Sequence, residues 1–160
     1  MHARSKARQG FTLVEILIVV VILGILAAIV IPQFTSASED ARASSLVSQL
    51  QTIRSQLELY QIQHNGEYPA DLATDWDEMT IADAQGRGPY LQQTPRNPFG
   101  PDGDGSVTAV QSLADLDAHN ATDWNYHPAT GQIKANLNIS AQQATDRNLN
   151  FSEADVNFAP

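Results

Sequence analysis

The chain has 160 residues, with 18 acidic side chains, nine basic ones and a formal net charge of -9. Its length allows one small globular domain and one membrane segment but leaves no room for a second domain. The acidic balance argues against nucleic acid as a partner. The chain contains no cysteine, which excludes a disulfide framework, a thiolate metal site and a cysteine nucleophile.

Basic residues are concentrated at the start of the chain, where Arg4, Lys6 and Arg8 lie within ten residues that contain no acid. The remainder carries six basic and 18 acidic residues, a formal balance of -12. No lysine or arginine follows until Arg42, beyond an apolar segment. Because positive charge flanks the cytoplasmic end of a membrane span, the sequence predicts a cytoplasmic start and an exported remainder.

Residues 11–31 form the apolar segment, a run of 21 residues interrupted only by Thr12, Glu15 and Gly24. As a helix, rising about 1.5 Å per residue, it reaches roughly 30 Å, the hydrocarbon thickness of a bilayer. A cleavable secretory signal is the alternative, with a cut at Ala27-Ala28 that would discard the helix. Such a signal has a shorter apolar region, so the sequence predicts a membrane-spanning helix instead.

Glu15 is the one charged residue of the apolar segment. A carboxylate inside a membrane is costly unless a cation or water compensates it. Glu15 either lies near the interface, where water and headgroups screen it, or pairs with a cation from another subunit. The residues around Glu15 favour the second interpretation.

Behind the short basic leader, residues 10–15 read GFTLVE, and the apolar helix continues to Pro32. This arrangement resembles the prepilin processing motif of the type IV pilin-like family. The resemblance implies that a prepilin peptidase cleaves between Gly10 and Phe11 on the cytoplasmic side and methylates the new amino terminus. Glu15 of an adjacent subunit is then expected to neutralise the Phe11 amine. Such a head-to-tail contact need not close into a ring, so it generates an open helical filament.

The helix is expected to extend beyond the membrane. Pro32 removes an amide donor and is predicted to kink the helix, with helical residues on both sides. Apolar residues then recur four and three positions apart, which indicates an amphipathic helix packed on its own domain. Asn65 and Gly66 tolerate left-handed backbone and predict the end of this helix. The apolar stripe consists of Leu46, Leu50, Ile53, Leu57 and Tyr60.

Local patterns beyond the helix extend the resemblance. GEYP at residues 66–69 is similar to the element that follows the long helix in major pseudopilins of type II secretion systems. Residues 123–126 and 132–137 predict two strands joined by a reversal with glycine at Gly131. The resemblance implies an α+β, pilin-like lollipop fold, in which a long amino-terminal helix packs on a small antiparallel β-sheet.

The predicted organisation has five parts. The tail is rich in Asn, Gln, Ala and Asp, and we expect it to be irregular or partly helical. The parts are a leader over residues 1–10, a membrane and polymerisation helix over 11–34, its amphipathic continuation over 35–64, a globular loop and sheet region over 65–137, and a polar tail over 138–160.

Asp102 and Asp104 lie one residue apart in the glycine-rich loop 101–106. Paired carboxylates in a flexible loop predict either a calcium site or a solvated turn. An EF-hand is excluded, because the sixth position from Asp102 is Val107 and the twelfth is Leu113. The resemblance implies calcium in an acidic loop nearer the carboxyl end, a pattern that does not align here, so calcium at Asp102 and Asp104 stays one of two hypotheses.

Motifs of catalytic chemistry are missing from the sequence. The histidines lack metal-ligand spacing and are predicted to lie at the surface or at a helix end. No hydrolase elbow, phosphate loop or zinc-protease helix is present. The sequence therefore predicts a protein that is not an enzyme. The histidines are His2, His64, His119 and His127.

The resemblance implies a structural subunit of a periplasmic pseudopilus that drives proteins across the outer membrane. Its expected partners are copies of itself, other pseudopilins, the inner-membrane assembly platform and the prepilin peptidase. The expected location is the bacterial inner membrane, with the amino terminus cytoplasmic and the globular domain periplasmic. Two alternatives stay open: a type IV pilin for attachment, motility or DNA uptake, and a periplasmic binding domain anchored by a single span.

Overall fold

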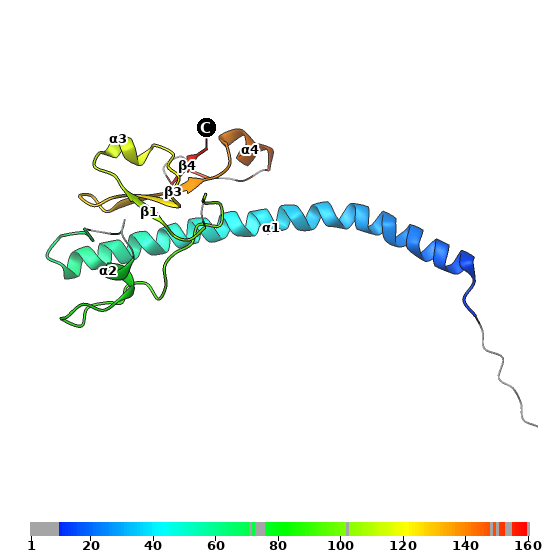
Figure 1. Cartoon of the computed structure of the whole chain (residues 1–160), viewed down its shortest axis with the longest axis horizontal. Helices are drawn as coiled ribbons and strands as arrows, with labels where there is room; N and C mark the ends of the chain where they lie inside the picture. The colour runs from blue at the N-terminus through cyan, green and yellow to red at the C-terminus, as the bar shows by residue number, and fades with distance from the viewer. Residues whose placement is uncertain are drawn as a thin grey trace, which may run out of the picture. The chain divides into compact units, whose positions relative to one another are not determined.

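The computed structural model describes residues 10–70, 72, 76–101, 103–147, 149, 151–152 and 155–159. It divides after Ser38 into two compact units, which are described separately (Figure 1). The elements in chain order are α1 (Leu13–Gln63), α2 (Asp77–Thr80), β1 (Val107–Ala109), α3 (Leu113–Leu116), β2 (Trp124–His127), β3 (Gln132–Leu137), α4 (Ala141–Asp146) and β4 (Val156–Phe158).

The first unit contains the amino-terminal part of α1. The long helix predicted from the sequence is confirmed, and it continues on both sides of Pro32. The predicted kink at that residue stays a prediction. Apolar side chains from Leu13 to Ile31 are exposed around the whole helix. Within the described residues, α1 is the one helix long and apolar enough to cross a membrane.

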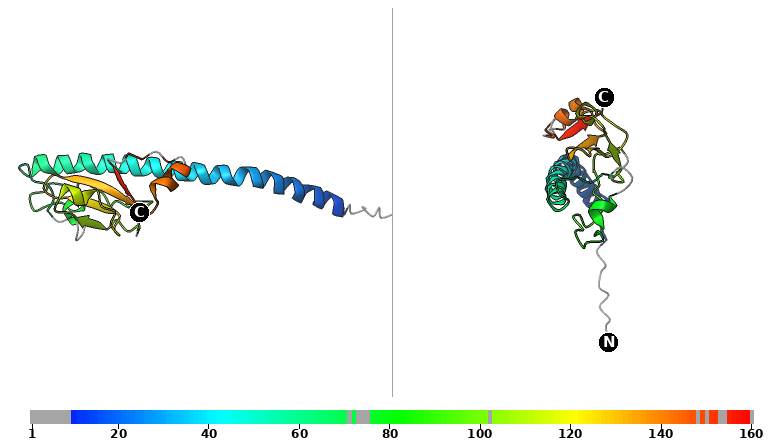
Figure 2. Two further views of the ribbon diagram at one scale, coloured as in Figure 1. Left: turned by 90° about the horizontal axis from the view of Figure 1, so that it is seen from above. Right: turned by 90° about the vertical axis from the view of Figure 1, so that its left-hand side faces the viewer.

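The second unit is built on the carboxyl-terminal part of α1, with the strands lying along it (Figure 2). The predicted stripe is confirmed, since its first four residues are at most 1% exposed and Tyr60 packs partly buried against the same core. The sheet contributes Trp124, Tyr126, Ile133 and Leu137, each at most 1% exposed. Burial of these large apolar side chains is the main force that holds helix and sheet together.

The end of α1 follows the predicted turn chemistry. Asn65 and Gly66 adopt φ angles of 56° and 93°, and Gly66 N–H donates to the Gln61 carbonyl at 2.8 Å. A few residues later, the carbonyl of Pro69 accepts from the buried Tyr126 hydroxyl at 2.9 Å. Burial raises the pKa of that hydroxyl, so it stays a donor. The loop after α1 is thereby fastened to the sheet.

The four strands form one sheet in the order β1-β2-β3-β4. β2 and β3 pair antiparallel as predicted. Gly131 has a φ of 67° in their turn, and a Cβ there would lie 2.2 Å from the Tyr68 ring, so both the backbone and the space require glycine. β1 pairs parallel with β2 and β3 pairs parallel with β4. The sheet is therefore mixed, and the expectation of an antiparallel sheet was wrong for its two outer pairs.

Crossover connections explain the mixed sheet. Parallel neighbours cannot be joined by a tight hairpin and need a longer connection that returns to the same end. α3 lies in the connection from β1 to β2, and α4 lies in the connection from β3 to β4. α4 begins with a capping box between Ser140 and Gln143, so the tail is partly helical as predicted. The strand β4 within that tail was not predicted.

Buried asparagines join three strands to α3. The Asn136 amide donates to Asn125 Oδ1 at 2.9 Å, and Asn136 Oδ1 accepts from Asn157 at 3.1 Å. Asn125 and Asn157 both donate to the carbonyls of Leu116 and Ala118 at the end of α3. Buried polar groups are tolerated when hydrogen-bonded in this way. The polar residue in the middle of β4 thus faces a network inside the protein.

Candidate functional site

Gly10 and Phe11 precede α1 and are both exposed. A Cβ added at Gly10 meets nothing within 4 Å. Neither close packing nor a left-handed backbone therefore demands glycine at position 10 in the described structure. Cleavage between Gly10 and Phe11, the role predicted for this glycine, stays a prediction.

Thr12 and Glu15 form a capping box at the start of α1. Thr12 donates to Glu15 Oε2 from both its amide and its hydroxyl, each at 2.8 Å. The Glu15 amide donates to Thr12 Oγ1 at 3.2 Å. This reciprocal pattern satisfies amides that the first helical turn leaves free, and it places a negative charge at the positive end of the helix dipole. The T-x-x-E spacing carried this signal, but sequence analysis considered Glu15 only as a carboxylate screened at the membrane interface or as a partner for another subunit.

The loop proposed for calcium is organised by a residue that sequence analysis missed. Asp123 is fully buried. Its Oδ1 accepts from the Gly103 amide at 2.9 Å and its Oδ2 from the Gly105 amide at 2.8 Å. A Cβ at Gly100 would lie 1.9 Å from Asp123 Oδ1. Both carboxylate oxygens are therefore engaged by the protein itself, and nothing in the local sequence distinguishes this aspartate from those of surface turns.

Asp104 accepts from the Ser106 amide at 2.8 Å, and that hydrogen bond is the main reason that its pKa is lowered. Asp102 lies outside the described residues. Within the described residues, no three metal-ligating side chains of the His, Cys, Asp and Glu types come together. The turn at Asp104 is closed by its own hydrogen bond, and calcium at Asp102 and Asp104 stays a hypothesis.

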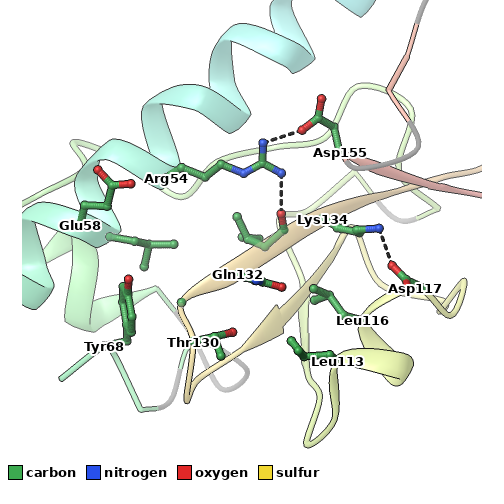
Figure 3. Close-up of a pocket in the computed structure, with 13 residues that line it drawn as sticks. Arg54, Glu58, Tyr68, Leu113, Leu116, Asp117, Thr130, Gln132, Lys134 and Asp155 are labelled. Carbon is green, nitrogen blue, oxygen red and sulfur yellow. Dashed lines mark hydrogen bonds and ion pairs between the residues drawn. The ribbon is translucent and has the colours of Figure 1, made fainter. Parts of the chain in front are cut away.

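A groove of about 530 Å³ lies between α1, α3 and β3 (Figure 3). On one side, Arg54 donates to Asp155 at 2.5 Å and to the Ile133 carbonyl at 2.9 Å. On the other side, Lys134 pairs with Asp117. Each of these two basic residues thus has an acidic partner, and Glu58 also lines the groove. The contacts fasten the segment before β4 to α1 and β3, which is a structural role.

The described histidines lie apart from one another in the fold. His64 ends α1 and stacks on Tyr60, as predicted for a helix end. His119 is half-buried, with Nε2 3.1 Å from the Leu137 carbonyl. His127 is buried and its Nδ1 lies 2.9 Å from the Thr130 hydroxyl, so the expectation of a surface or helix-end position was wrong for it.

Comparison with known families places these features in a class. Residues 5–31 match the model of the prokaryotic N-terminal methylation motif. The match covers Gly10, Phe11, the capping box and most of the apolar part of α1. It defines a class of prokaryotic proteins that carry a methylation motif on an apolar amino-terminal helix.

A second match defines the family within this class. Residues 33–121, more than half of the chain, match the model of type II secretion system protein G. The chain belongs to this family. The pseudopilin resemblance derived from the sequence is thereby confirmed. Strands β2, β3 and β4 lie beyond the matched residues.

Individual relatives agree with the family match. A type II secretion system core protein G of Klebsiella pneumoniae is 32% identical over 106 residues, covering 61% of this chain and 73% of the relative. The Escherichia coli protein of the same description is 32% identical over 111 residues, 64% of this chain and 73% of the relative. The Pseudomonas aeruginosa protein is 42% identical over 67 residues, 42% of this chain and 46% of the relative. No solved structure matches.

Proposed function

We propose that the chain is a structural subunit of a helical pseudopilus that drives protein secretion across the outer membrane. The observation that carries this proposal is that the methylation motif and the protein G domain match consecutive parts of the chain, joined by one helix, α1. The subunit is made as a precursor, cleaved between Gly10 and Phe11 by prepilin peptidase and methylated at the Phe11 amine.

Glu15 drives assembly in this proposal. Cleavage creates an amine at Phe11, at the start of an apolar helix. Glu15 of an adjacent subunit neutralises that amine, and each subunit supplies both groups, so the contact repeats into an open filament. The capping box with Thr12 supports this step, because it holds the carboxylate at the first helical turn, close to Phe11.

The exposed apolar surface from Leu13 to Ile31 supports a single span of the bacterial inner membrane. The basic leader stays cytoplasmic and the globular domain lies in the periplasm. The partners of the subunit are its own copies, other pseudopilins, the inner-membrane assembly platform and the prepilin peptidase.

The role is mechanical rather than enzymatic. In the groove between α1, α3 and β3, Arg54 pairs with Asp155 and Lys134 pairs with Asp117, and the pairs hold elements of the fold together. The match to protein G favours a pseudopilus over a surface pilus for attachment, motility or DNA uptake. The methylation motif at the start of the apolar helix favours both over a simple membrane tether.

Expression in a bacterium that contains a type II secretion assembly tests the proposal. Mass spectrometry of the extracted protein is expected to show a methylated amino terminus at Phe11. Shearing and sedimentation are expected to recover polymer. A chain that keeps all 160 residues and never sediments would support the anchored binding domain instead.

A further inference from the structure

The basic residues after the leader differ in whether the structure gives them an acidic partner. Arg96 has Asp104 nearby, since its positive charge adds to the Ser106 hydrogen bonds that lower the pKa of that carboxyl. Arg42 is exposed on α1 and makes no ion pair with the described residues. The other four are paired as Arg54–Asp155, Arg87–Asp83, Lys134–Asp117 and Arg147–Glu39.

A pocket of about 330 Å³ lies beside the end of α1, α2 and the loop that follows α2. Its wall is aromatic. The Tyr60 ring stacks on His64 with centroids 3.7 Å apart, and the Tyr90 ring tilts against Tyr60 at 5.2 Å. Faces of aromatic rings attract cations, and arginine stacks on them with its flat guanidinium group.

Acidic residues line the same pocket. Asp77, Glu78 and Asp83 line it together with one basic residue, Arg87, so the lining carries more acidic than basic residues. Asp83 is bound by Arg87 at 2.5 Å and lies 3.4 Å from His64 Nε2. Burial raises the pKa of the Tyr60 hydroxyl, and the charge of Glu78 raises it further.

We propose that this pocket receives the Arg42 guanidinium of a second copy of the chain. The inference rests on the proposed function, because it requires a polymer. A pocket with aromatic faces and excess carboxylate suits arginine, which combines ring stacking with hydrogen bonds to acids. In a subunit with a formal charge of -12 after cleavage, a cation placed at a contact between copies also offsets part of their mutual repulsion.

The spacing along α1 requires that Arg42 comes from another copy. Arg42 precedes Tyr60 by 18 residues of one helix, which is about 27 Å at a rise of about 1.5 Å per residue. An arginine side chain does not reach that far within its own chain. A parallel copy displaced by about this distance toward the carboxyl-terminal end of α1 brings its Arg42 level with the pocket.

Cysteine cross-linking tests the contact in a chain that has no cysteine of its own. The double variant Arg42→Cys with Glu78→Cys is expected to form a ladder of disulfide-linked chains in sheared polymer. Each single variant is expected to give dimers at most. The pair Arg42→Cys with Gln92→Cys, in which Gln92 is exposed and outside the pocket, serves as the control and is expected to give no ladder.

Charge exchange gives a second measurement. Arg42→Glu is expected to lower the yield of sedimented polymer several-fold, and adding Glu78→Arg is expected to restore it. Arg96→Glu makes the same charge change at another exposed arginine and is expected to affect the yield far less. All variants are compared at matched levels of the mature, membrane-extracted protein.

The outcomes separate this inference from the proposed function. Polymer without a ladder from the Arg42 and Glu78 cysteine pair overturns the pocket contact and leaves the pseudopilus intact. A loss of polymer in Arg42→Glu that Glu78→Arg does not restore also overturns it, and assigns Arg42 to another contact, such as lipid phosphates. Absence of polymer from the parent chain refutes the proposed function and this inference together.

Discussion

Thr12 and Glu15 hold each other at the first turn of α1, through two hydrogen bonds of 2.8 Å to the carboxylate and one of 3.2 Å to the hydroxyl. Glu15 thus has a structural role within one subunit. The same geometry keeps its charge beside Phe11, where cleavage is proposed to create an amine. Helix capping and the proposed subunit pairing therefore involve the same carboxylate, and substitutions can separate the two.

Glu15→Leu is expected to abolish polymer while the monomer still inserts and its globular domain still folds. Leucine removes the free-energy cost of placing a carboxylate in the membrane, but the Phe11 amine of each neighbour loses its counter-charge in an apolar bundle. Glu15→Gln keeps an acceptor oxygen for Thr12 without the charge, and it is expected to fail as well. Sedimentation of sheared polymer at matched expression measures the loss. Normal yield from either variant would refute the pairing and return Glu15 to a screened interfacial position.

Thr12→Ala is expected to lower polymer yield less than Glu15→Leu does. It removes the hydroxyl that caps α1, a loss that typically costs about 1 kcal/mol at a helix start, but it leaves the Glu15 charge in place. Thr12→Ser keeps a hydroxyl and is expected to behave like the parent. The same sedimentation assay ranks the variants. Equal losses in Thr12→Ser and Thr12→Ala would show that the threonine methyl group, and not the cap, matters.

Gly10→Leu is expected to accumulate as uncleaved precursor with a folded globular domain. The structure leaves open space where the new side chain would lie, so the substitution is not expected to disturb the fold. A peptidase cleft that fits glycine is expected to exclude the larger leucine side chain. Mass spectrometry of the membrane-extracted protein checks the amino terminus. A mature protein that begins at Ala28 or later, in the parent chain, would contradict the whole processing scheme because a different peptidase would be responsible.

The elements that follow a regular pattern could be predicted from the sequence. The stripe from Leu46 to Tyr60 has the helical period, and glycine at Gly131 marks the reversal between β2 and β3. β1 and β4 are three residues long, too short to show a period. Their parallel pairing depends on crossovers through α3 and α4, which no local pattern encodes.

Functional residues could be predicted from the sequence only where they lie within one short segment. The residues from Gly10 to Glu15 form a compact motif, and the family comparison confirms the class to which it belongs. The role of Asp123 could not be predicted from the residues around it. Its hydrogen-bond donors are the amides of Gly103 and Gly105, some 20 positions away in the sequence. The pocket beside Tyr60 likewise combines α1 with residues 77–90.

The calcium hypothesis for Asp102 and Asp104 makes a separate prediction. If the loop binds calcium, replacing both residues by alanine lowers the melting temperature only when calcium is present. The parent chain is compared in calcium and in chelator, in detergent solution. Equal melting curves for the parent under both conditions would remove the site and leave the solvated turn closed by Ser106.

Asp123→Asn is expected to destabilise the globular domain strongly although it changes one atom. The Asp123 carboxylate is fully buried and each oxygen accepts one backbone amide. An asparagine side chain has one acceptor oxygen, so its NH₂ group would face a second donor, at Gly103 or at Gly105. A buried donor left without an acceptor costs about 1–3 kcal/mol, and the lost hydrogen bond to a charged group had contributed about 1.5–3 kcal/mol.

Urea unfolding of the detergent-solubilised full chain measures the effect of Asp123→Asn. We expect its free energy of unfolding to fall by about 2–4 kcal/mol with the denaturant slope unchanged. Asp104→Asn is the matched control, because Asp104 is an exposed carboxylate that accepts from the Ser106 amide. Its midpoint is expected to stay near that of the parent. Equal midpoints for both variants would show that the hydrogen bonds from Gly103 and Gly105 to Asp123 do not stabilise the domain in solution.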